Sequence, residues 1–294
     1  MAAVDLRPLS LGEILDRTFT LYRRNFLLFL GIAAIPNLLV LALNLVQVFM
    51  SEGPKGVGHT VPRSEQFQST LGSSSGGLLA LGIVGVLVAV VVYFVAYLFA
   101  QGGTVYAVSD LYLGQPTSIG TSLKRMRGEL GSLLGVIMLN GLAMMAATLA
   151  FIIPGIYLAC RLLPCIPAAL LENLGPRASL ERSFRLTKGF AGRAFGIYVL
   201  YFILLYASMM LFMMPFAFVA GLYAKNPVLY HFWLALAQVG DVIASILISP
   251  ILTIATAVFY YDLRVRKEAF DLQYMMNPAG AVSAGAPGVP TLLS

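Results

Sequence analysis

The sequence predicts an all-α fold: a polytopic membrane helix bundle with about six transmembrane helices and three amphipathic helices at the cytoplasmic interface. Apolar residues make up 59% of the 294 residues and charged residues only 11%, whereas a soluble domain carries about 25% charged residues. Six apolar stretches approach or exceed the roughly 20 residues that a membrane-spanning helix needs. The basic residues gather in short clusters between these stretches, as is typical of membrane proteins.

The six predicted spans are separated by polar or basic links. Their bounds are Phe26–Met50, Leu78–Leu113, Leu133–Ile153, Ile156–Leu171, Ala194–Tyr223 and Phe232–Tyr261. At a rise of about 1.5 Å per residue, the second, fifth and sixth exceed the thickness of the bilayer core, so we expect them to tilt, bend or protrude. Gly102-Gly103 and Pro215 are the expected bends. Pro164 and Pro167 should break the hydrogen-bond ladder of the short fourth helix.

Two segments lack apolar periodicity. The Gly/Ser/Pro-rich loop from Ser51 to Gly77 is predicted to be flexible. The Ala/Gly/Pro-rich tail, residues 277–294, is predicted to be disordered. Residues 1–276 are therefore expected to form a single transmembrane domain.

The distribution of basic residues predicts the orientation in the membrane. Three fall on one side of the six predicted spans: Lys55, Arg63 and Lys225. Fifteen fall on the other: Arg7, Arg17, Arg23, Arg24, Lys124, Arg125, Arg127, Arg177, Arg182, Arg185, Lys188, Arg193, Arg264, Arg266 and Lys267. By the positive-inside rule the second side is cytoplasmic. Both termini are then cytoplasmic, which requires an even number of spans, and the loop from Ser51 to Gly77 is external.

Three basic segments before spans resemble one another and indicate an internal repeat. Residues 10–24, 118–130 and 179–190 each open with a serine that can cap a helix, and Ser10 with Glu13 forms a capping box. Each segment carries an apolar stripe typical of a helix at headgroup level. The predicted units, each an interfacial helix and a hairpin of two spans, cover about 10–113, 118–172 and 179–262. Alternatively, any basic linker before a span has this appearance.

Three acidic residues lie at the inner ends of the even-numbered spans: Asp110, Glu172 and Asp262. They can hold the basic interfacial helices by ion pairs, or they can simply mark the topology. No partner base or metal ligand accompanies them in the sequence, so an enzymatic role has no support.

Polar residues inside the spans suggest a candidate intramembrane site. Arg161 in the fourth span and Asp241 in the sixth each cost at least about 2.5–3.5 kcal/mol to place in the bilayer. We expect both in the outer half of the membrane and within ion-pair reach, directly or through Gln238. Such a pair can be purely structural or part of a substrate or ion pathway, and one or both residues can instead reach water.

The sequence also resembles a known family. The resemblance lies in three places: the run from Leu6 to Asp16; Pro167-Ala168 with Glu172 and Ser179–Ser183; and Tyr260–Glu268 with Phe270–Leu272. These motifs are similar to bacterial proteins named for the membrane domain of glycerophosphoryl diester phosphodiesterase. The resemblance implies a multi-pass protein of the bacterial inner membrane.

That resemblance covers the membrane domain alone. In fused relatives a separate soluble domain performs hydrolysis with a His-Arg start and a Glu-Asn-Thr metal-binding stretch, and this chain has neither. Its histidines, His59 and His231, lie outside such a context. The spacing of Cys160 and Cys165, without a nearby histidine, is poor for zinc. No enzyme activity, cofactor or metal is therefore expected.

The sequence favours a non-enzymatic integral inner-membrane protein that organises or binds lipids or partner proteins. The expected partners are membrane lipids, with anionic headgroups on the cytoplasmic side, and a membrane-protein partner or a second copy; nucleic acid is not expected. The alternative is a small transporter or lipid translocator with its polar site around Arg161 and Asp241.

Overall fold

The computed structural model describes residues 7–51 and 76–268, and every regular element in these two ranges is an α-helix. The predicted tail and all but the ends of the predicted loop lie outside the described residues. The helices are α1 Leu11–Arg24, α2 Phe26–Ser51, α4 Gly76–Tyr112, α5 Ile119–Met126, α6 Leu130–Ala150, α7 Ile152–Leu162, α8 Cys165–Leu171, α9 Pro176–Thr187, α10 Ala191–Phe212, α11 Met214–Leu222 and α12 Pro227–Glu268.

Six stretches of the described chain are long and apolar enough to cross a membrane, which confirms the prediction of a multi-pass helical protein. The predicted breaks also occur. The fourth span divides into α7 and α8 at Leu163 and Pro164. The fifth divides into α10 and α11 at Met213, with Pro215 in the first turn of α11. At 42 residues, α12 continues past the predicted end at Tyr261.

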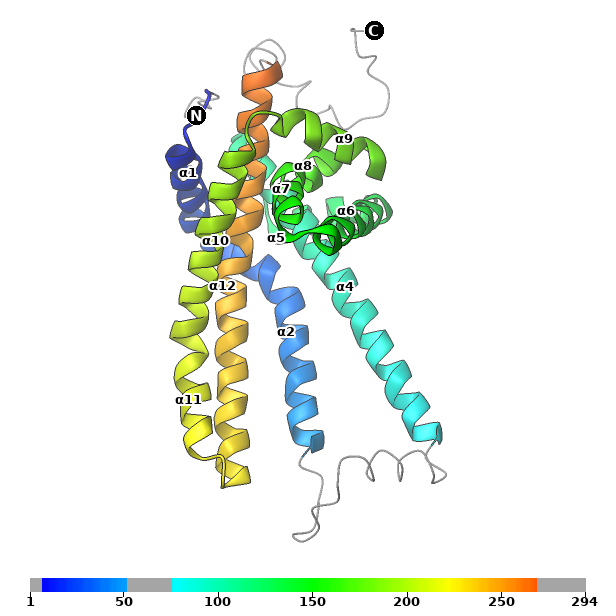
Figure 1. Ribbon diagram of the computed structural model, residues 1–294, viewed down its shortest axis with the longest axis vertical. Helices are drawn as coiled ribbons and strands as arrows, with labels where there is room; N and C mark the ends of the chain where they lie inside the picture. The colour runs from blue at the N-terminus through cyan, green and yellow to red at the C-terminus, as the bar shows by residue number, and fades with distance from the viewer. Residues whose placement is uncertain (1–6, 52–75, 269–294) are drawn as a thin grey trace.

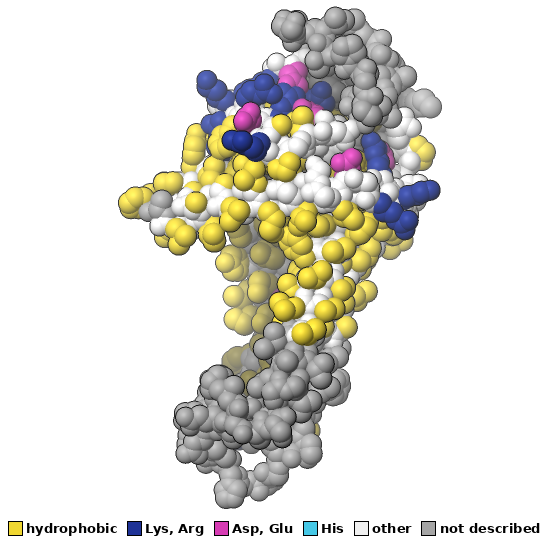
Figure 2. Space-filling model, turned by 90° about the vertical axis from the view of Figure 1, so that its right-hand side faces the viewer, with side chains coloured by type: hydrophobic (Ala, Val, Ile, Leu, Met, Phe, Trp, Pro, Cys, Tyr) yellow, Lys and Arg dark blue, Asp and Glu magenta, His cyan; other side chains and the backbone are white. Residues whose placement is uncertain are grey.

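The spans do not all run in one direction. In Figure 1, α2, α4, α10, α11 and α12 follow the long axis of the molecule, whereas α6 and α7 are seen nearly end-on. The hairpin of α6 and α7 therefore lies crosswise, and Figure 2, which views it from the side, shows an apolar arm that leaves the bundle. Leu149, Phe151 and Ile153 at the turn of this hairpin are 75–81% exposed.

The central helix of the bundle is α12, which packs against α1, α2, α4, α10 and α11. Near its charged end, a run of consecutive side chains is almost fully buried: Ala257, Val258, Phe259 and Tyr260. A helix that buries all its faces is surrounded by other elements. This half of α12 therefore forms the core on which the shorter helices assemble.

At the predicted bend, Gly102-Gly103, α4 continues as one helix without a break. The two glycines instead allow α5 to lie directly on α4. A Cβ atom added to Gly102 would lie 2.0 Å from the sulfur of Met126, and one added to Gly103 would lie 3.0 Å from Leu123. Close helix packing explains this pair.

Another glycine allows an even closer approach and gives a stability prediction. A Cβ atom on Gly240 of α12 would lie 2.0 Å from the carbonyl oxygen of Phe212, at the junction of α10 and α11. Because backbone cannot move aside as a side-chain tip can, Gly240→Ala should destabilise the protein by about 1–3 kcal/mol, the usual cost of overpacking. The measurement is the free energy of unfolding in detergent micelles.

Gly221→Ala is the matched control for that measurement. Gly221 also lies in a helix, and a Cβ atom there meets nothing within 4 Å. Alanine favours the helix by up to about 1 kcal/mol over glycine, so this variant should be neutral or stabilised. Equal stabilities for the two variants would show that α12 does not approach the α10–α11 junction as closely as described.

Candidate functional site

Lys, Arg, Asp and Glu side chains gather at one end of the molecule, above the apolar body, as Figure 2 shows. We call this region the charged end. It contains the three acids that the sequence singles out, Asp110, Glu172 and Asp262. Each of them pairs with an arginine, and Asp262 is the most deeply buried of the three.

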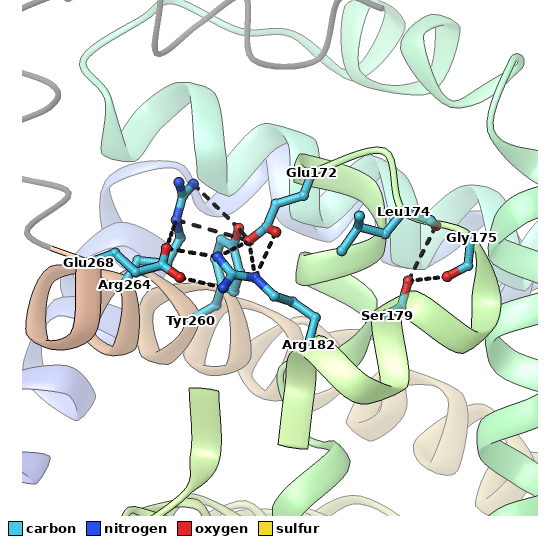
Figure 3. Close-up of polar contacts among 8 residues, drawn as sticks. All are labelled: Glu172, Leu174, Gly175, Ser179, Arg182, Tyr260, Arg264 and Glu268. Atoms are coloured by element: carbon cyan, nitrogen blue, oxygen red, sulfur yellow. Dashed lines mark hydrogen bonds and ion pairs between the residues drawn. The ribbon is translucent and has the colours of Figure 1, made fainter. Parts of the chain in front are cut away.

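Glu172 lies at the centre of the largest polar network (Figure 3). Arg182 of α9 donates to both of its carboxylate oxygens, with distances of 2.7 Å to Oε2 and 2.8 Å to Oε1. The Tyr260 hydroxyl donates to Oε1 at 2.7 Å. Arg182 also binds Glu268, which in turn accepts from Arg264 at 3.2 Å. Two carboxylates thus hold two guanidinium groups between α9 and α12.

The network keeps Arg182 charged. Burial by itself would lower the pKa of Arg182, but hydrogen bonds to Glu268 and Glu172 raise it above its ordinary value. The sequence pointed to Glu172 but not to its partners on α12. A usable signal was present: Tyr260, Arg264 and Glu268 recur at intervals of four residues and therefore share one face of a helix. Ending the sixth span at Tyr261 hid this pattern.

Asp262 has a fully buried carboxylate that ties the beginning of the described chain to its last helix. It accepts from the backbone N–H of Leu9 at 2.7 Å. It also accepts from Arg266 at 3.0 Å and from Arg193 at 3.4 Å. Both arginines donate to the carbonyl oxygen of Leu9 as well. The start of α1 is therefore fixed to α10 and α12 through charge-assisted hydrogen bonds.

Asp110 makes the weakest of the three connections. Its carboxylate accepts from Arg125 of α5 at 3.3 Å, and the arginine side chain is 46% exposed. Arg125 also lies over the ring of Tyr106, 4.5 Å from the centroid. Each acid thus forms an ion pair, as in the first of the two roles considered for these residues. Asp110 and Glu172 each bind an arginine of the helix that follows. Asp262 binds two arginines and the chain at the start of α1.

The serines expected to cap the interfacial helices fall into two groups. Ser10 and Ser118 are N-cap residues with capping boxes, as predicted. The N–H and hydroxyl of Ser10, with Arg7, lower the pKa of Glu13 to about 2. Ser179 is not a cap, and that prediction is wrong. Pro176 begins α9 one turn earlier, and the Ser179 hydroxyl is buried and donates to the Gly175 carbonyl.

Arg161 lies at the charged end, so its predicted place in the outer half of the membrane is wrong. Its guanidinium donates to the Thr187 hydroxyl at 3.0 Å and to the Phe184 carbonyl at 2.6 Å, both on α9. It also donates to the Tyr157 hydroxyl at 3.0 Å. The prediction assumed that α7 runs parallel to α12, but the crosswise hairpin carries Arg161 beneath α9.

The predicted ion pair between Arg161 and Asp241 is consequently not formed. Gln238 is bound elsewhere: its side-chain oxygen accepts from the Asn44 amide of α2 at 3.1 Å. Asp241 is half-buried on α12, and no hydrogen bond or ion pair joins it to a described residue. The structure therefore does not bring the three members of the predicted intramembrane site together.

Metal and cofactor ligands were not expected from the sequence. Within residues 7–51 and 76–268, no group of three or more His, Cys, Asp or Glu residues is placed to hold a metal ion. Cys160 and Cys165 are buried free thiols.

Comparison of the chain with protein-family models, with curated proteins and with solved structures finds no match.

Proposed function

We propose that this chain is a non-enzymatic integral membrane protein of the bacterial inner membrane that binds and organises anionic lipids at its charged end. The observation that carries the proposal is a surplus of positive charge there. Seven exposed basic residues form no ion pair with any described carboxylate: Arg23, Arg24, Lys124, Arg127, Arg177, Arg185 and Lys188. Only three exposed or half-buried acids of this end form no ion pair with a described basic residue: Asp16, Glu129 and Glu181.

The positions of these basic residues suit lipid headgroups. Arg23 and Arg24 end α1 directly before the span that begins at Phe26. Lys124 and Arg127 precede the apolar helix α6, and the remaining three flank or lie on α9. We infer that α1, α5 and α9 are amphipathic helices at the cytoplasmic interface, where each nearby Lys or Arg contributes about 1 kcal/mol to binding of anionic headgroups.

A pocket at this end offers room for a headgroup. It has a volume of about 560 Å³, and its charged lining residues are Glu172, Glu181, Arg182, Arg185 and Arg264. Arg182 and Arg264 already bind carboxylates, whereas Arg185 is exposed. Arg182 and Arg264 thus form part of the pocket wall, and the guanidinium of Arg185 is the group that would bind a lipid phosphate. The family resemblance, which concerns membrane domains without hydrolytic motifs, agrees with a binding role.

Lipid binding can be measured on the purified protein in neutral detergent. We expect phosphatidylglycerol to bind more tightly than phosphatidylcholine, as counted by native mass spectrometry across a lipid titration. A variant that replaces Arg23, Arg24, Arg177 and Arg185 with Gln should lose about fivefold in phosphatidylglycerol affinity per residue, corresponding to about 1 kcal/mol each. Raised salt should reduce the difference, because screening weakens exposed charges.

Lys225→Gln is the matched control, because Lys225 is an exposed basic residue in the link between α11 and α12, away from the charged end. It should leave phosphatidylglycerol binding unchanged. Equal affinity of the wild type for the two lipids, or an equal loss in the control and the fourfold variant, would refute lipid binding at the charged end.

A further inference from the structure

Two pockets lie next to each other among the long helices and share a polar wall. The first, about 190 Å³, lies between α2, α4 and α12. The second, about 240 Å³, lies between α4, α6, the α7–α8 junction, α10 and α12. Tyr97, Gln101, Ser249 and Thr253 line both. The Thr253 hydroxyl donates to the side-chain oxygen of Gln101 at 2.8 Å. The side-chain amide nitrogen of Gln101 donates to the Tyr97 hydroxyl at 3.1 Å.

The lining of both pockets is uncharged and mostly apolar, with hydroxyl and amide groups among the apolar side chains. None of the described residues that line them is Asp, Glu, Lys or Arg. Pro36, which lines the first pocket, lies ten residues, or about 15 Å, along α2 from its start at Phe26. At such a depth an ion without an opposite charge is expensive to bind. The lining therefore favours a neutral ligand that forms hydrogen bonds.

Acceptors in or beside these walls lack a full set of donors. Pro36 and Pro250 lie inside α2 and α12 and line the first pocket. A proline has no N–H, so the carbonyl oxygens of Ile32 and Ile246 lose their usual helical donor. In the second pocket, the side-chain oxygen of Asn140 is buried and has no hydrogen-bond partner among the described residues. Such a site calls for a ligand that donates, as hydroxyl groups do.

The first pocket has an approach from the lipid side. Nine of the ten residues from Val84 to Tyr93 on α4 are exposed. Tyr93 lines the pocket and is 36% exposed. On the facing helix, Leu38 is 54% exposed. Acyl chains that lie along α2 and α4 can therefore place a headgroup at the pocket.

We propose that these pockets hold the neutral, hydroxyl-rich headgroup of a membrane glycolipid, with its acyl chains along the exposed part of α4. A sugar hydroxyl donates to the side-chain oxygen of Asn140, while Gln101 and the hydroxyls of Ser249 and Thr253 fix the orientation. This site is separate from the charged end and does not rest on lipid binding there.

The test is equilibrium binding of radiolabelled monoglucosyl diacylglycerol to the purified protein. The detergent is a polyoxyethylene ether, because a glycosidic detergent would itself compete. We expect Gln101→Leu and Asn140→Leu each to weaken binding at least tenfold. Gln238→Leu, which removes an amide from the same bundle outside both pockets, should change it less than twofold. Thr253→Val, a smaller change, should give an intermediate loss in a protein that remains monodisperse.

Competition identifies the ligand chemistry. Unlabelled glycolipid should displace the label, whereas phosphatidylglycerol should need at least a tenfold higher concentration and free glucose should not compete at millimolar concentration. Equal competition by phosphatidylglycerol would overturn the neutral-headgroup assignment, and equal competition by glucose would overturn the lipid assignment. Equal losses of glycolipid affinity in Gln101→Leu and Gln238→Leu would show that the glycolipid does not bind in these pockets. The fourfold Arg→Gln variant of the charged end should bind the glycolipid like the wild type.

Discussion

Asp262→Asn is expected to cause the largest loss of stability of any single substitution among the acids of the charged end, about 3–5 kcal/mol. Its carboxylate is fully buried and is bound by the backbone of Leu9 and by Arg193 and Arg266. The amide keeps the shape of the side chain but removes the negative charge, so two arginines remain without their counter-charge. The free energy of unfolding in detergent micelles measures the effect.

The control for this substitution is Asp16→Asn. Asp16 is an exposed acid on α1 and has no described ion-pair partner, so its loss should stay within about 0.5 kcal/mol. If Asp262→Asn lowers the free energy of unfolding no more than Asp16→Asn does, Asp262 does not hold the start of α1.

The second large effect is expected in the network of Figure 3. Glu172→Gln should cost about 3 kcal/mol, near the lower end for breaking a buried pair, because Glu268 continues to bind Arg182. The double variant with Arg182→Gln should lose less than the sum of the two single variants, by about 0.5–3 kcal/mol. Unfolding of the four proteins under one condition completes the cycle.

Asp110→Asn provides the comparison for this cycle. Its partner Arg125 is largely exposed, and exposed pairs contribute at most about 1 kcal/mol. The three acids should therefore rank Asp262, Glu172, Asp110 in their effect on stability. Additive losses in the Glu172–Arg182 cycle would mean that the two side chains act independently.

The sequence predicts the spans well because their signal is local. A run of about twenty apolar residues can be recognised as a span without knowledge of the rest of the fold. Pro164 and Pro215 interrupt helices through the geometry of proline itself. The crosswise direction of α6 and α7 leaves no such local signal, because a span and an arm have the same composition. The error for Arg161 follows directly, since its depth was counted along a helix assumed to be parallel to the others.

The parity of the topology does not depend on that error. A hairpin begins and ends on the same side of the membrane whether it crosses twice or not at all. The predicted common side of the two termini therefore follows from either arrangement of α6 and α7. The sequence could single out the three acids because a position at the end of a span restricts where a charge can lie. Their partners, such as Arg182 and Arg266, depend on packing between distant segments and could not be derived from the sequence.

The hydrogen bond from Leu9 to Asp262 joins residues 253 positions apart, and this separation bears on how the protein is made. During synthesis α1 emerges first, but the carboxylate that fixes its start is added only with the last helix. Contacts of such long range close late in folding. Until α12 is made, α1 therefore has no docking partner for its start and depends on its own capping box. Chains truncated before α12 should leave α1 undocked and open to proteolysis.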